Sequence, residues 1–243
     1  MTPAPPVAGA QDRAPQVREM FEQLAPRYDL ANRVLSLGLD QSWRRRAVAA
    51  LGPLQGRVAV DLCAGTLDLT EHLLAGGAAQ VHALDFSAKM LEVGRAKLPP
   101  DAPVTVATAD ARALPLDDNS VDAIICGFGL RNVPEVERAV AECARVLRPG
   151  GRLVVLDFFT PEGAVPRLLQ ASYNRLVVPV VGGLITGFGE AYRYLAGSID
   201  AFCTRPAFVT LMGEAGFAAE GWEVFPPVAS IVVGVRSPEV PHA

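Results

Sequence analysis

The chain of 243 residues contains few of the residues that build metal sites and disulfide frameworks. Its four cysteines and three histidines are scattered, and no pair has the spacing of metal ligands. We therefore expect no metal site. We expect the cysteines to be buried, reduced thiols, as is usual in a cytoplasmic protein.

The chain also lacks an excess of basic residues. Its formal net charge is −4 and its pI is about 5.4. Binding to nucleic-acid phosphates requires a basic face. The composition therefore argues against a dedicated nucleic-acid-binding protein.

Long apolar runs are missing too. The longest stretch without charge, 176–189, is interrupted by Pro179 and several glycines, and a membrane-spanning helix needs about 20 apolar residues. Residues 1–15 are rich in Pro and Ala and lack the apolar core of a signal peptide, which predicts a disordered tail. Half of the residues are hydrophobic, enough for one folded domain over 16–236, followed by a short tail at 237–243.

The hydrophobic pattern changes from helical to alternating along the chain. Helices are expected at 17–28 and 32–51, the second interrupted by Gly38, and a mixed helical insert at 160–200. Between them we expect strands at 58–62, 81–85, 103–108, 121–126 and 152–157, with helices at 67–75, 87–97 and 134–147; a helix at 205–215 and strands at 218–224 and 229–235 follow. This alternation implies right-handed crossovers and a parallel sheet, closed by an antiparallel edge pair.

Acidic residues mark the ends of three successive predicted strands. Asp61 lies near the end of the first, Asp85 at the end of the second and Asp110 just after the third. Ligands of open parallel sheets bind beyond the carboxyl ends of the strands, and a carboxylate after the second strand can hold ribose hydroxyls. A tight turn also follows the first strand, so the layout predicts a nucleoside pocket.

Two nucleoside cofactors fit this layout, NAD and S-adenosylmethionine. The NAD fingerprint needs three glycines where this chain has Cys63, Gly65 and Asp68. An acid in the turn would repel a diphosphate, whereas it suits the ammonium and sulfonium groups of S-adenosylmethionine. The turn therefore favours the methyl donor, although an ordinary structural turn remains the alternative.

Four motifs carry a resemblance to a known family. They are Met20-Phe-Glu-Gln-Leu-Ala-Pro-Arg-Tyr-Asp29 with Leu35-Ser-Leu-Gly-Leu39 and Trp43-Arg44, the turn after Asp61, Phe128-Gly-Leu-Arg-Asn-Val133, and Tyr192-Arg-Tyr-Leu195. Together they span most of the chain. The sequence resembles the quinone C-methyltransferases of ubiquinone and menaquinone biosynthesis, such as demethylmenaquinone methyltransferase, within the class I S-adenosylmethionine-dependent methyltransferases.

The resemblance implies a Rossmann-like α/β fold, with a mostly parallel seven-stranded sheet, an antiparallel edge strand and helices on both faces. It implies S-adenosylmethionine as cofactor, with Asp85 at the ribose, Asp110 and Ala111 at the adenine and Thr66 near the methionine. The full set of expected cofactor-binding residues is Asp61, Gly65, Thr66, Asp85, Phe86, Asp110, Ala111 and Gly127.

Two departures from the family pattern are visible. Leu67 replaces a glycine of the first turn, so we expect strain if the position needs positive φ, and we expect the side chain to narrow the methionine end of the site. The end of the chain, Pro226-Pro-Val-Ala-Ser-Ile-Val-Val-Gly234, lacks the family's histidine. These changes leave open a different phenolic or polyketide acceptor, or a cofactor-binding assembly or regulatory subunit without turnover.

The expected reaction moves a methyl group to a carbon of a prenylated hydroquinone. A ring carbon becomes nucleophilic when a neighbouring hydroxyl loses its proton. We expect Arg131 to stabilise the resulting phenolate and Asn132 to orient a hydroxyl, with Tyr192 as a further catalytic candidate; for Arg131 a surface salt bridge is the alternative. Tyr28, Asp29 and Tyr194 are other polar candidates.

The expected partner is a small-molecule prenylated quinol, with a homodimer left open. The run Arg44-Arg45-Arg46 reads as a solvated helix face, with contact to anionic lipid as the alternative. We therefore expect a cytoplasmic protein, with peripheral contact at the inner membrane surface left open.

Overall fold

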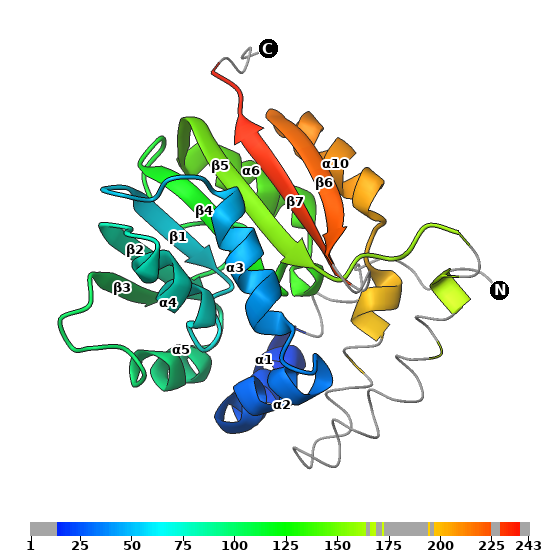
Figure 1. Ribbon diagram of the computed structural model, residues 1–243, viewed down its shortest axis with the longest axis horizontal. Helices are drawn as coiled ribbons and strands as arrows, with labels where there is room; N and C mark the ends of the chain where they lie inside the picture. The colour runs from blue at the N-terminus through cyan, green and yellow to red at the C-terminus, as the bar shows by residue number, and fades with distance from the viewer. Residues whose placement is uncertain are drawn as a thin grey trace.

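The computed structural model describes residues 14–163, 166–168, 172, 194, 197–224 and 229–238. Its centre is one seven-stranded sheet with the strand order β3-β2-β1-β4-β5-β7-β6 (Figure 1). The strands are β1 (Val58–Leu62), β2 (Gln80–Asp85), β3 (Val104–Thr108), β4 (Val121–Gly127), β5 (Leu147–Asp157), β6 (Phe217–Val224) and β7 (Ala229–Arg236).

The first five strands run parallel, and β7 is antiparallel to both β5 and β6. This arrangement confirms the predicted mostly parallel sheet with an antiparallel edge. Strand β1 pairs with β2 along one edge and with β4 along the other, so the strand order reverses at β1. Such a reversal of strand order opens a crevice at the carboxyl ends of the strands, where ligands of this architecture bind.

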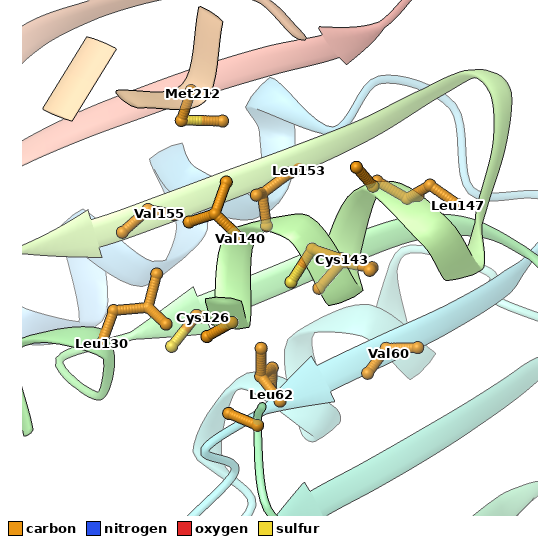
Figure 2. Close-up of a cluster of buried hydrophobic side chains, with 14 of the residues drawn as sticks. Val60, Leu62, Cys126, Leu130, Val140, Cys143, Leu147, Leu153, Val155 and Met212 are labelled. Atoms are coloured by element: carbon orange, nitrogen blue, oxygen red, sulfur yellow. The ribbon is translucent and has the colours of Figure 1, made fainter. Parts of the chain in front are cut away.

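Helices cover both faces of the sheet. On one face, α3 (Asp40–Ala50) and α4 (Asp68–Ala75) pack through Trp43 and Leu73 against the strands. On the other face lie α6 (Val136–Val146) and α10 (Arg205–Glu214). Figure 2 shows Val140, Cys143 and Met212 of these two helices beside strand residues such as Val60 and Val155. Alternate residues of the central strands β1, β4 and β5 thus enter two separate cores.

The N-terminal helices differ from their predicted bounds. The helix predicted at 17–28 is α1 (Ala14–Leu24) followed by a 3-10 turn, η1 (Ala25–Arg27). Pro26 lacks the N–H that an α-helix would need there, which explains the change. The helix predicted at 32–51 is two helices, α2 (Tyr28–Leu35) and α3, and Gly38 with φ of 77° lies in the turn between them.

Other bounds lie close to the prediction. The N-cap predicted for α5 (Ala88–Arg95) is confirmed, because the Ser87 hydroxyl accepts from the Met90 N–H at 3.3 Å. Strand β5 begins at Leu147, earlier than predicted, since the Arg148–Gly151 segment continues the strand through an irregular register with β4. Most of the predicted insert at 160–200, including Tyr192, lies outside the described residues. In the part of the chain that is described, no helix has the length and apolar character to span a membrane.

Candidate active site

The turn between β1 and α4 places three residues at positive φ. Cys63, Gly65 and Leu67 have φ of 56°, 53° and 66°, and for a residue with a side chain this conformation costs roughly 1–2 kcal/mol. Neighbouring groups hold the turn in place, because the Gly65 N–H donates to Asp85 Oδ2 at 2.9 Å. The turn backbone therefore lies against the end of β2.

Leu67 occupies this turn without reaching the cavity. The expected positive φ is confirmed, but its side chain is fully buried and belongs to the cluster of Ala64, Ala83, Leu91 and Leu98. The cavity wall described below does not include it. The prediction that Leu67 narrows the methionine end is therefore wrong, because the side chain turns into the core.

Asp85 ends β2 as a buried carboxylate with two backbone donors. Oδ2 accepts from the Gly65 N–H, and Oδ1 accepts from the Ser87 N–H at 2.8 Å. Burial raises the pKa of this carboxyl above its ordinary value, and the backbone donors oppose the rise. A carboxylate oxygen has two lone pairs, so each oxygen can still accept a hydroxyl.

The end of β3 presents a second acid that is already paired. Asp110 accepts from the backbone N–H of Arg112 at 2.9 Å and from its Nη2 at 2.7 Å. The Arg112 guanidinium lowers the pKa of Asp110. Arg112 also donates to Glu135 Oε1 at 2.9 Å, so it ties the end of β3 to the start of α6.

A cavity of about 350 Å³ opens between these strand ends, within the usual range for small-molecule sites. It is lined by Val17, Arg18, Phe21, Tyr28, Leu62, Cys63, Gly65, Leu84, Asp85, Phe86, Met90, Thr108, Ala109, Asp110, Ala111, Arg112, Gly127, Phe128, Gly129, Asn132, Val133, Pro134 and Tyr194. Six of the eight expected cofactor residues are in this wall, together with Asn132. Asp61, Thr66 and Arg131 are not.

Asp61 lies behind the wall in a buried polar cluster. It is 1% exposed, its Oδ2 accepts from the Thr70 hydroxyl at 2.7 Å, and burial raises its pKa to about 7. Its Oδ1 and the Nε of buried Arg44 have no hydrogen-bond partner among the described residues. The expected contact of Asp61 with the cofactor stays a prediction.

The expectation that Arg44, Arg45 and Arg46 form a solvated helix face is wrong for Arg44. Arg45 and Arg46 are exposed, as a solvated helix face requires, but Arg44 is buried. Its guanidinium lies 3.7–3.8 Å from carboxylate oxygens of Asp40 and Asp68 and 5.5 Å from the Phe128 ring centroid. Arg44 is therefore a buried cation next to the site and is not available to a lipid surface.

Thr66 links the first turn to the N-terminal helices. Its hydroxyl donates to Asp29 Oδ1 at 2.5 Å, and Lys97 donates to Asp29 Oδ2 at 2.7 Å and to Asp68 Oδ1 at 3.0 Å. Thr66 is 2% exposed and holds α2 against the turn. Its expected role near the methionine group also stays a prediction.

Arg131 forms a buried ion pair behind the opposite wall. Its Nη1 donates to Asp157 Oδ1 at 2.8 Å and to the Phe128 carbonyl oxygen at 2.5 Å. The two side chains are 5% and 0% exposed, so the surface salt bridge considered from the sequence is wrong. Arg131 fixes the segment after β4, η2 (Leu130–Asn132), from behind.

Asn132 and two tyrosines form the polar part of this end of the cavity. The Tyr194 hydroxyl donates to Asn132 Oδ1 at 3.2 Å. Tyr28 enters from the start of α2, and burial raises the pKa of its hydroxyl. Phe128, with φ of 60°, adds an aromatic face. The wall therefore offers neutral donors and acceptors beside an aromatic surface, which suits a phenolic ring.

Helix α1 contributes wall residues that the sequence reasoning missed. Val17, Arg18 and Phe21 line the cavity, and Phe21 meets Phe86 edge-on with ring centroids 6.0 Å apart. The Arg18 guanidinium lies over the Phe86 ring, 5.8 Å from its centroid. Only Phe21 falls within the family motif at 20–29, and nothing in the local pattern marks Val17 or Arg18.

Comparison with known proteins agrees with this architecture. Solved structures of S-adenosylmethionine-dependent methyltransferases from Thermotoga maritima (21% identity, TM-score 0.64, covering 90% of this chain and 99% of the other) and Mesorhizobium loti (22%, TM-score 0.60, covering 79% and 96%) share the fold. The fold is therefore that of the class I methyltransferases.

Two sequence relatives are much more similar. The demethylmenaquinone methyltransferase of Thermus thermophilus is 44% identical over 89% of this chain and 100% of its own length. The ubiquinone/menaquinone biosynthesis C-methyltransferase UbiE of Geobacter sulfurreducens is 36% identical over 85% of this chain and 82% of its own. The model of one family matches residues 8–235. The chain belongs to the ubiE/COQ5 methyltransferase family and is an S-adenosylmethionine-dependent methyltransferase.

Proposed function

We propose that this enzyme methylates a ring carbon of a prenylated hydroquinone such as demethylmenaquinol. The observation that carries the proposal is the 44% identity with a demethylmenaquinone methyltransferase over that relative's whole length. An aromatic and neutral polar wall at one end of the cavity agrees with a flat phenolic acceptor.

The residues present fit the cofactor. Asp85 keeps lone pairs for ribose hydroxyls, and Gly65 and Gly127 are part of the same cavity wall. Asp61 lies just behind the wall, and we propose that its Oδ1, which has no hydrogen-bond partner among the described residues, approaches the ammonium of the methionine group and gives up its proton there. When bound, S-adenosylmethionine supplies a methyl group that is already activated for transfer.

The chain's own contribution is to orient the acceptor and exclude water. Asn132 and Tyr28 line the cavity and would hydrogen-bond the acceptor hydroxyl. Tyr28 would do so as a neutral donor, because the ordinary tyrosine pKa is about 10 and burial raises it further. As donors, they would stabilise a phenolate as the proton leaves. Arg131 would act through Phe128 and Asn132 as a positioning residue, since Asp157 neutralises its charge.

One experiment distinguishes this proposal from the two alternatives, which are methylation of another phenolic acceptor and a subunit without catalytic activity. The purified chain is incubated with radiolabelled S-adenosylmethionine and a short-tailed demethylmenaquinol, and the site of methylation is identified by mass spectrometry. Transfer to the ring carbon supports the proposal. Transfer only to unrelated phenols assigns another acceptor, and cofactor binding without any transfer assigns a non-catalytic subunit.

Variants of the acceptor wall sharpen this test. Asn132→Ala and Tyr194→Phe remove one polar group each from the proposed acceptor site, whereas Ser120→Ala alters a hydroxyl that donates to Asp117 in a remote turn. We expect the first two to lower kcat more than they weaken cofactor binding, and the third to change neither. A homodimer is a further proposal, which sedimentation equilibrium of the same preparation measures.

A further inference from the structure

Helix α2 and the loop that follows it expose apolar side chains to solvent. Among the described residues, Leu30, Val34 and Leu37 are three of the five exposed large hydrophobic residues, with exposures of 57%, 39% and 87%. Leu30 and Val34 are four residues apart and share one face of α2, and Leu37 follows in the turn after the helix. An apolar helix face ordinarily packs against the protein core, so this outward face indicates a partner.

Leu37 makes the case stronger because its backbone is strained. It has φ of 53°, a conformation that glycine or asparagine adopts at lower cost. With 87% of its surface exposed, the side chain gains almost no burial in return. A strained and exposed leucine contributes little to the stability of the fold. Strain of this kind tends to persist at functional sites.

The charges around this face are basic. Arg27 and Arg33 are exposed. The nearest acids in sequence are Asp29, whose carboxylate is bonded to Lys97 and Thr66, and Asp40, which is buried beside Arg44. The chain as a whole carries a net charge of −4, so the positive charge of this segment is opposite in sign to that of the whole protein. Apolar side chains flanked by arginines on a helix are typical of segments that lie in the interface of an anionic bilayer.

We propose that the docking face, formed by Leu30, Arg33, Val34 and Leu37, rests on the surface of an anionic lipid bilayer. Figure 1 shows α2 beyond the ends to which the arrows of β1 and β4 point, on the side of the sheet where the cavity opens. Tyr28, in the cavity wall, begins the same helix. Docking therefore brings the cavity close to the lipid. The use of this position to receive a prenylated acceptor rests on the proposed function, but lipid binding itself does not.

The test is flotation of the full chain with vesicles, without cofactor or acceptor. We expect binding to vesicles of phosphatidylglycerol and phosphatidylcholine, weakened by salt, and little binding to phosphatidylcholine alone. Leu37→Asn should reduce binding on the order of tenfold, because it removes a leucine from the apolar phase. Arg33→Gln should reduce it about fivefold on the anionic vesicles only. Asparagine tolerates the backbone at position 37, so the fold is kept.

Trp222→Gln is the matched control, since Trp222 is 41% exposed on β6, away from α2. Unchanged binding by Leu37→Asn, or an equal loss with Trp222→Gln, would overturn the docking face. A dimer that Leu37→Asn dissociates, without any vesicle binding, would overturn it in favour of a second copy of the chain. Methyl transfer to the short-tailed demethylmenaquinol is measured separately, in detergent without vesicles: its absence in the parent enzyme counts against the proposed function and leaves the flotation result standing.

Discussion

Replacement of Leu67 by glycine tests how this chain tolerates its altered first turn. The family pattern places glycine here, and the leucine adopts φ of 66°. Glycine would relieve roughly 1–2 kcal/mol of backbone strain. Its greater freedom in the unfolded chain would also cost about 0.5–1 kcal/mol, which offsets roughly half of that gain.

Packing decides the outcome. Leu67 is fully buried against Leu91 and Leu98, and loss of a buried leucine side chain costs about 2–5 kcal/mol. We therefore expect Leu67→Gly to lower the free energy of unfolding by about 2–4 kcal/mol. Leu67→Ala keeps the strain but retains one buried methyl, worth about 0.8 kcal/mol, so it should be about as stable as Leu67→Gly.

The assay is urea denaturation of the three proteins, followed by calorimetry with S-adenosylmethionine where each is folded. Because the side chain faces the core, cofactor affinity should stay within about threefold of the parent value, less than 1 kcal/mol. A glycine variant as stable as the parent would refute the packing argument. A large loss of affinity in a folded variant would show that Leu67 shapes the cavity after all.

Three further predictions concern the buried carboxylates Asp85, Asp157 and Asp61. Asp85→Asn should weaken S-adenosylmethionine binding about tenfold or more, measured by calorimetry, because the carboxylate loses charge-assisted bonds to hydroxyls. Arg131→Ala should lower the free energy of unfolding by about 3–5 kcal/mol, since it strands the Asp157 carboxylate, and a double change of Arg131 and Asp157 to Leu should recover part of the loss in urea denaturation. Asp61 has a pKa of about 7 in the fold against about 4 when unfolded, so it keeps a proton that the unfolded chain releases. Its contribution therefore makes stability fall as the pH rises from about 4 to about 7, and Asp61→Asn should remove that slope.

The sheet and most of its helices could be predicted because their signals are local. Short apolar runs with Asp61 near the end of one and Asp85 at the end of the next specify strands, and Ser87 marks the start of a helix through its own hydroxyl. The cavity wall at Asp85 and Asp110 follows from the same logic, since strand ends of a parallel sheet meet at one edge. Such features depend on residues that are neighbours in sequence.

What the sequence could not predict depends on distant partners. Arg44 belongs to the Trp43-Arg44 motif, but nothing in the local pattern shows that it alone of the three arginines is directed into the core, beside Asp61. Arg131 looks free in its motif, but Asp157 arrives from the next strand to pair with it. The side chain of Leu67 is directed by Gly94 on α5, where an added Cβ would come 2.4 Å from the leucine Cγ. In each case, the orientation of the side chain is set by packing against residues distant in sequence, which no local pattern encodes.

The same long-range contacts connect the cavity to the proposed docking face. Asp29 of α2 is bonded to Thr66 in the first turn and to Lys97 just after α5. Helix α2 therefore cannot shift far without disturbing the turn that lies against Asp85. Because one short helix carries Tyr28 on its inner side and Leu30 and Val34 on its outer side, contact with a bilayer would set the orientation of the cavity. A hydrophobic acceptor could then enter from the lipid without passing through water, which is the physical advantage of placing apolar residues at this position.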